Sequence, residues 1–160
     1  MRTKKNAYDL KKRRGLSMWD FVAKDAASRI GGVHFQEGDV VASDAFMILI
    51  LTNQDYPSEM EGRTITKSGL DTRQRYPHYK GLCIEDYFSN EEIEPEWDKW
   101  KEDCRIAGRM VRPIHIKRLC RLNQQWGIDK ITIGKRSFYF YGHDFMGECM
   151  FILNHSIYGL

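Results

Sequence analysis

The sequence predicts an α+β fold, built from two antiparallel three-stranded meanders that are each preceded by a helix. Strand-forming residues fill the segment 29–51 and are interrupted by two short groups of turn residues. The segment 130–153 repeats this pattern. Between them, residues 114–126 place apolar side chains at helical spacing after a proline. We therefore expect two antiparallel sheets on which helix 114–126 packs, in a doubled arrangement of helix and meander.

Length and composition are those of a soluble globular protein. The chain has 160 residues, enough for one domain with its own core, and 42% of them are apolar. No apolar run approaches the roughly 20 residues of a membrane span, and the N-terminus lacks an apolar signal region. We expect a cytoplasmic protein without a membrane partner, with a basic N-terminal segment (residues 1–16) and a single domain (residues 17–160).

The four cysteines favour free thiols over a metal site. They lie far apart in the sequence, without a Cys-x-x-Cys pair or a nearby pair of histidines, which structural zinc sites usually contain. The cysteines are Cys83, Cys104, Cys120 and Cys149. We expect neither a metal nor a cofactor.

Charge is sorted along the chain although the net charge is only +3. Residues 1–14 are basic, residues 85–103 are mainly acidic, and residues 105–136 are again basic with one acid, Asp129. Such segregation creates local potentials that the total conceals, so a polyanion could bind one face while another repels it.

The N-terminal segment carries a cluster of four consecutive cations. A short helix over residues 7–14 and a further turn over residues 19–23 are expected, with Gly15 between them. The cluster is either part of a solvated tail or a nucleic-acid-binding arm. Its members are Lys11, Lys12, Arg13 and Arg14.

The first meander is the stretch around which the rest of the chain is organised. Glu37, Gly38 and Asp39 form its first break, and the second break contains Asp44, which we expect to accept backbone N–H groups within the turn. The polar stretch that follows, residues 53–75, is expected to form an extended hairpin or arm with one short strand over residues 63–66.

An acidic insertion, at about residues 85–104, separates the two halves. It contains a predicted helix over residues 90–103, in which Trp97 and Trp100 share one face because they are three residues apart. One interpretation is a surface helix that the two indoles pin to the core. The other is a helix that binds a partner protein through Trp97 and Trp100 or imitates the charge of DNA.

The second helix has an apolar face and a cationic face. Ile116, Leu119 and Cys120 are predicted to face the core. The polar face carries no acid and suits contacts to phosphate, although a merely solvated face explains it equally well. Three of its residues, spaced by four and three positions, form one stripe with a fourth beside it. The stripe is Lys117, Arg121 and Gln124, and the neighbour is Arg118.

The last meander is expected to have strands at residues 130–133, 137–141 and 148–153, with a loop over residues 142–147. Aromatic side chains fill both faces of strand 137–141, so this strand lies centrally or one of its faces meets a partner. The loop contains His143 and Asp144, a dipeptide that in a loop usually belongs to a turn. With His78 and His155, these are the available acid or base groups, but no nucleophile or phosphate-binding motif accompanies them, so we expect no catalytic residues and no enzyme.

Several segments together resemble a domain of the bacterial sliding clamp, the beta subunit of DNA polymerase III, and in particular short clamp-like proteins of bacterial genomes and mobile elements. Residues 21–33 resemble the start of a clamp domain, residues 41–45 (Val-Ala-Ser-Asp-Ala) its Ala-Thr-Asp-Gly turn, and residues 75–79 (Arg-Tyr-Pro-His-Tyr) its Phe-Pro-x-Tyr segment. Residues 114–125 and the strands after them resemble its second helix and meander. A clamp chain has three such domains and this chain holds one, without the strand expected before the first helix and with an additional acidic helix.

The resemblance implies a DNA-clamp fold and a non-catalytic role on DNA, in replication or in the maintenance of mobile elements. In a clamp domain the helices face the duplex, and the corresponding helix here, 114–126, is the one with the cationic face. We therefore expect sequence-independent contacts to duplex phosphates. The DNA-contacting residues are then expected to be Lys117, Arg118, Arg121 and Gln124 together with the cluster at 11–14. The alternative is an interaction module that keeps the fold without DNA binding and engages a replication protein through its tryptophans. A lone domain could encircle DNA only as a homo-oligomeric ring.

Overall fold

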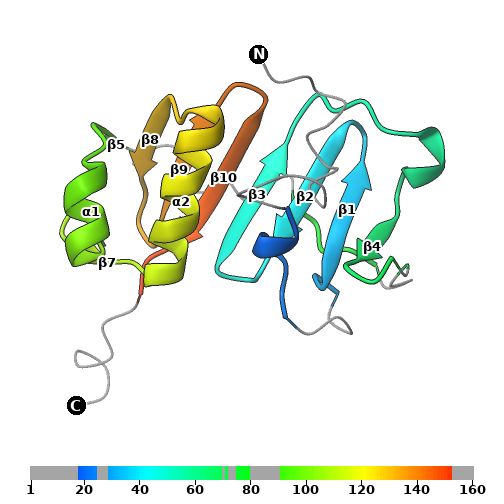
Figure 1. The fold of residues 1–160 in the computed structure, drawn as a ribbon, viewed down its shortest axis with the longest axis horizontal. Coiled ribbons are helices and arrows are strands. Elements are labelled where there is room, and N and C mark those ends of the chain that lie inside the picture. Colours follow the sequence, from blue (N-terminus) through cyan, green and yellow to red (C-terminus); the bar gives the residue numbers. More distant parts are fainter. Residues whose placement is uncertain (1–17, 25–28, 70, 72–74, 80–90, 153–160) are drawn as a thin grey trace.

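The computed structural model describes residues 18–24, 29–69, 71, 75–79 and 91–152. Within these residues, the chain forms one eight-stranded antiparallel sheet, and helices cover one of its faces (Figure 1). The helices are the 3₁₀ turns η2 (Met18–Phe21) and η3 (Ser58–Met60), and the α-helices α1 (Trp97–Asp103) and α2 (Pro113–Trp126). This mixture of helix and antiparallel sheet confirms the predicted α+β class.

The first meander has the expected strands, β1 (Gly32–Gln36), β2 (Asp39–Ser43) and β3 (Met47–Leu51). The β1–β2 hairpin turns on Glu37 and Gly38, whose φ angles of 49° and 83° lie in the left-handed region. Two consecutive residues with positive φ match the twist of a two-residue hairpin, and a glycine adopts this conformation without strain.

The second meander consists of β8 (Lys130–Ile133), β9 (Ser137–Gly142) and β10 (Phe145–Met150). The predicted loop over residues 142–147 is wrong, because β9 and β10 are joined by a two-residue turn, His143–Asp144, and β10 already begins at Phe145. β9 pairs with strands on both sides, and both of its faces are buried over residues 137–140. The central position of this aromatic strand is therefore confirmed.

The two meanders are not separate sheets, as the sequence had suggested, but one. β3 pairs with β10 along residues 47–51 and 145–149, which gives the strand order β4-β1-β2-β3-β10-β9-β8-β5. Each meander thus presents its last strand to the other, and the sheet runs through the join without a break (Figure 1). All five residues of β3 are buried, whereas β10 buries Phe145, Gly147 and Cys149 on one face and leaves Met146, Glu148 and Met150 on the other face partly exposed.

The outer edges of the sheet are two short strands. β4 (Thr64–Thr66) pairs with β1 and corresponds to the strand predicted at 63–66. β5 (Glu91–Ile93) pairs with β8, at a place where the sequence predicted a helix from residue 90. The helix begins only at Trp97, because Pro95 restricts the residue before it to extended conformations and lacks a backbone donor.

Helices α1 and α2 are connected by a tight hairpin, β6 (Arg105–Ile106) and β7 (Arg109–Met110). Ala107 and Gly108 form its turn with φ angles of 53° and 75°. α1 itself ends at Cys104, which has a left-handed backbone and donates its N–H to the carbonyl of Trp100 at 2.9 Å.

The main core lies between the sheet and the helices. It combines Met18 and Phe21 from η2, Trp100 from α1 and the inward side chains of α2 with one face of both meanders. A smaller apolar cluster lies on the opposite face, where Tyr76 and Tyr79 cover Val41, Ile48 and Ile50. No helix in the described part of the chain is long and apolar enough to cross a membrane.

Candidate functional site

Helix α2 places the charged residues of the candidate site. Pro113 occupies its first turn, where a missing backbone donor costs nothing, and Gly127 ends it with φ 78° and an N–H bond to the carbonyl of Asn123 at 2.9 Å. Ile116, Leu119 and Cys120 are buried, as the helical spacing predicted. Lys117 and Gln124, on the other side of the helix, are exposed.

An open groove runs along α2 on the side that faces α1. Its volume is about 520 Å³, which lies in the usual range for ligand-sized clefts. Its cationic and amide-bearing residues are Lys117, Arg121 and Gln124 from α2 and Lys101 from α1. Its apolar residues are Cys104, Pro113, Ile116 and Cys120. The three stripe residues predicted from the sequence thus lie together, and Lys101 is a further cation that sequence reasoning missed.

Arg118 does not share this groove, although the sequence placed it beside the stripe. Its side chain is 13% exposed and donates a hydrogen bond of 2.6 Å from Nη1 to Oδ2 of Asp44. The guanidinium carbon also lies 5.4 Å from the centre of the Phe21 ring, within the range of a cation–π contact. Arg118 is therefore held against Asp44 and Phe21 and is not part of the exposed stripe.

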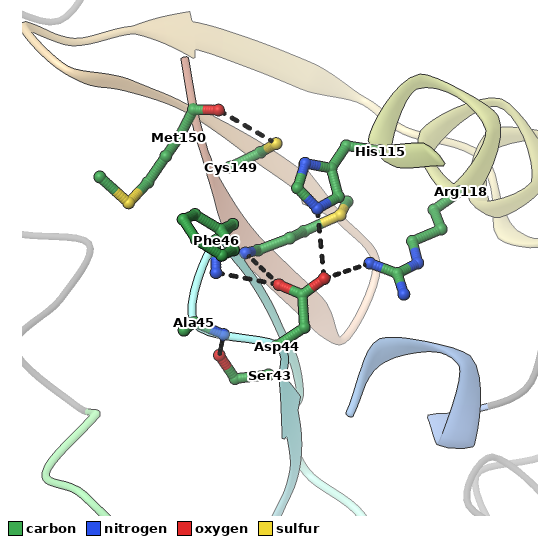
Figure 2. A network of polar contacts seen from close by, with 9 residues as sticks. Ser43, Asp44, Ala45, Phe46, His115, Arg118, Cys149 and Met150 are labelled. Atoms are coloured by element: carbon green, nitrogen blue, oxygen red, sulfur yellow. Dashed lines mark hydrogen bonds and ion pairs between the residues drawn. The ribbon is translucent and has the colours of Figure 1, made fainter. Parts of the chain in front are cut away.

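Asp44 is the centre of a network that joins the β2–β3 turn to α2 (Figure 2). Its Oδ1 accepts the backbone N–H groups of Phe46 at 2.9 Å and Met47 at 2.8 Å, which confirms the predicted turn role. Its Oδ2 lies 3.2 Å from Nε2 of His115 and also accepts the bond from Arg118. Spacing by three positions predicts that His115 and Arg118 share a helix face, but no sequence signal indicates that Asp44 lies opposite them.

The network holds Asp44 ionised. Burial alone would raise the pKa of this carboxyl, but the hydrogen bonds from His115, Arg118 and the two backbone N–H groups outweigh it and hold the pKa well below its usual range. A carboxylate that is fixed by four donors has little capacity left to take up a proton from a substrate. This arrangement is typical of a structural ion pair.

A buried thiol beside this network is not a plausible nucleophile. Burial, and next the negative charge of Asp44, raise the pKa of Cys149 far above its ordinary value, so the reactive thiolate is disfavoured. Its Sγ lies 3.8 Å from the carbonyl oxygen of Met150 (Figure 2). Cys149 and Cys120 are buried free thiols, as expected, Cys104 is a partly exposed one, and Cys83 lies outside the described residues.

The two tryptophans of α1 do not form an exposed partner-binding surface. The Trp100 side chain is 2% exposed and belongs to the main core, and Trp97 packs edge-on against it with ring centroids 5.2 Å apart. The ring of Trp100 is the hydrophobic anchor of the helix, which agrees with the interpretation of a surface helix pinned to the core. Trp97 is partly buried against the same core.

The other predicted residues are accounted for as follows. The His143 ring is 90% exposed and lies 3.3 Å from Asp144, whose positive φ of 60° and hydrogen bond from Asn53 at 3.0 Å identify a turn residue. The basic cluster, which consists of Lys11, Lys12, Arg13 and Arg14, lies outside the described residues, as does His155.

Comparisons with known proteins give little beyond this geometry. No family model and no curated protein match the chain. Among solved structures, the chain is similar to a crystal structure assigned to a DNA polymerase III beta subunit of Eubacterium rectale, with 11% sequence identity and a TM-score of 0.24. The similarity covers 84% of this chain and 26% of that protein, so the chain spans about a quarter of its length. Similarity at this level carries no argument about function, which depends on the residues described above.

Proposed function

We propose that this chain is a non-catalytic protein that binds duplex DNA without sequence preference through the exposed side of α2. The observation that carries the proposal is the row of Lys117, Arg121 and Gln124 along one groove, with Lys101 across from it. Cations and amides bind phosphate oxygens, and contacts of this kind hold a duplex without reading its bases. The groove-lining residues include no carboxylate that would repel a phosphate.

The acidic residues of α1 are the main argument against DNA binding. Asp98, Glu102 and Asp103 are exposed on the helix that forms the other side of the groove. Among the described residues, however, no ion pair joins an α1 carboxylate to Lys117 or Arg121. These two cations therefore remain available for a phosphate in the part of the chain that the structure describes.

The likeness of residues 41–45 and 75–79 to clamp segments gives the proposal its biological context. A clamp-like chain of this kind would act in DNA replication or in the maintenance of a mobile element. The cluster at residues 11–14 would add phosphate contacts on the same duplex, and a homo-oligomeric ring would be needed if the chain encircled DNA.

Retention on duplex DNA at increasing salt concentrations tests the proposal. The variant Lys117→Ala/Arg121→Ala should bind more weakly to every DNA sequence, and the slope of log K against log salt should become shallower by about 0.9 for each lost phosphate contact. The matched control is Lys135→Ala/Arg136→Ala, which removes the same charge from the β8–β9 turn. Equal losses in the two variants, or no salt-sensitive retention of the unmodified chain, would refute the proposed role of α2.

A further inference from the structure

The groove between α1 and α2 has a second property that DNA would leave unused, which is its apolar floor. Ile116 and Cys120 belong to the main core and form the bottom of the groove, with the ring of Pro113 and the side chain of Cys104 beside them. A phosphate group has no apolar part to place there. A protein segment can do so with a single aliphatic or aromatic side chain, whose transfer from water into the groove favours binding.

The rim of the groove is cationic on both sides. Lys101 is contributed by α1, and Lys117 and Arg121 by α2. Two opposite charges of α1 act on Cys120 in the floor: burial raises the pKa of Cys120 most, the charge of Lys101 lowers it, and that of Asp98 raises it. Because none of the lining residues is acidic, the complementary occupant is one that carries carboxylates.

The walls of the groove are held in place by the core. Trp100 fixes α1 from below, and the backbone N–H of Val111 donates to the carbonyl of Cys104 at 2.9 Å, which ties the end of α1 to the segment that leads into α2. A site with fixed walls loses little conformational entropy when it is occupied. The groove therefore does not need to be assembled by its ligand.

We propose that this groove is a docking site for an acidic protein segment that carries one apolar anchor residue. The anchor contacts the floor at Ile116 and Cys120, and the flanking carboxylates of the segment pair with the cations of the rim. The inference extends the proposed function, since Lys117 and Arg121 are the cations assigned there to DNA. An acidic segment and a duplex would consequently compete for the same face of α2.

Fluorescence anisotropy with the full chain and labelled peptides tests the docking site. The probes are peptides of about twelve residues, made of Asp and Glu with a central Leu, Phe or Trp, and a reference peptide with Ser at the centre. At least one anchored peptide should bind about tenfold more tightly than the Ser peptide, a difference that corresponds to one buried apolar side chain. Equal affinity of all peptides would mean that the groove is a plain polyanion site and would overturn the proposal.

Two variants localise the binding. Gln124→Trp fills the groove without removing a charge and should weaken the anchored peptide about tenfold or more, whereas Gln125→Trp, a neighbouring exposed position that does not line the groove, should not. Lys117→Glu/Arg121→Glu should abolish peptide binding. If Gln124→Trp and Gln125→Trp bind the peptide equally well, the docking site is refuted.

The same variants separate this inference from the proposed function. Gln124→Trp removes one amide assigned to DNA, so its DNA retention should weaken somewhat. The slope of that retention against salt should stay the same, because the charges of Lys117 and Arg121 are intact. Peptide binding without any DNA retention would refute the proposed function and leave the docking site standing. DNA retention without preference for an anchored peptide would refute the docking site and leave the proposed function standing.

Discussion

Arg118 of α2 donates a hydrogen bond of 2.6 Å to the carboxylate of Asp44, which lies 74 residues earlier in the turn between β2 and β3. The two side chains are 13% and 17% exposed, so the pair is largely shielded from water. It connects the first meander to the helix that precedes the second, at the same junction where β3 pairs with β10. The contact therefore holds the two halves of the fold in one arrangement.

Asp44→Asn should lower the free energy of unfolding by about 2–4 kcal/mol, because it leaves the guanidinium of Arg118 partly buried without its counter-charge. Urea denaturation measures this change. The control, Asp129→Asn, alters an exposed aspartate and should stay within about 0.5 kcal/mol of the unmodified chain.

The same carboxylate predicts how stability changes in acid. The pKa of Asp44 is lower in the folded chain than in the unfolded chain, so its contribution is fully present above about pH 4 and is lost as the pH falls towards the folded pKa. Asp44→Asn should therefore be less sensitive to acid below pH about 4 than the unmodified chain. If the free energy of unfolding of the two proteins fell equally with decreasing pH, the ionised state of Asp44 would be contradicted.

Arg118→Ala and Arg121→Ala should behave differently although both remove one cation from α2. Arg118→Ala leaves the carboxylate of Asp44 without its strongest donor and should cost about 2–4 kcal/mol of stability. Arg121 lines the groove, and its loss should change stability by no more than about 0.5 kcal/mol. Thermal melting of the two variants is the measurement, and equal melting temperatures would show that the Asp44 pair contributes nothing.

Gly147→Ala should destabilise the centre of the sheet by about 1–3 kcal/mol through overpacking. Gly147 lies on β10 between Phe140 of β9 and Leu49 of β3, and an added Cβ would collide with the ring of Phe140 and the backbone carbonyl of Ile48. Met150→Ala, at a partly exposed position of the same strand, is the control and should cost less. The free energy of unfolding is measured by urea denaturation. If Gly147→Ala left it unchanged, the tight packing around Gly147 would be contradicted.

Stability should also fall as the pH drops below about 6.5, because of His34. This ring is 4% exposed and stacks on Tyr76 with centroids 4.3 Å apart, its Nδ1 is 2.7 Å from the Thr64 hydroxyl, and its Nε2 is 2.9 Å from Oε1 of Gln36. The amide oxygen of Gln36 only accepts, so Nε2 carries the proton and the neutral ring is satisfied on both sides.

Burial lowers the pKa of His34, and the hydrogen bond to Gln36 and the charge of Glu61 oppose this only in part. A lowered folded pKa means that the unfolded chain binds the proton first, so stability is complete above the unfolded pKa of about 6.5 and declines as the pH falls towards the folded value, by at most about 1.4 kcal/mol per pH unit. Urea denaturation between about pH 7.5 and 5 measures the slope. The variant His34→Gln should make the dependence of stability on pH shallower. An unchanged slope in this variant would mean that another group causes the pH dependence.

The elements that depend on local chemistry could be predicted from the sequence. Glu37 and Gly38 favour a tight hairpin whatever surrounds them, and Pro113 fixes the start of α2 because its ring suits a first helical turn. The row of Lys117, Arg121 and Gln124 could be predicted for the same reason, since 3.6 residues per turn place them on one side of any helix. Even locally the reasoning failed at residues 91–93, where acidic composition suggested a helix and pairing with β8 produced a strand.

The α+β class, the turns and the periodic faces of α2 could be predicted because they follow from interactions between residues a few positions apart. The pairing of β3 with β10, the contact of Arg118 with Asp44 and the place of Lys101 in the groove depend on how the elements pack in three dimensions. Each of these contacts connects segments that are distant in the chain. Their energy depends on which apolar faces are buried against each other, and a polar residue such as Arg118 is drawn inward only when a carboxylate is already fixed at that place.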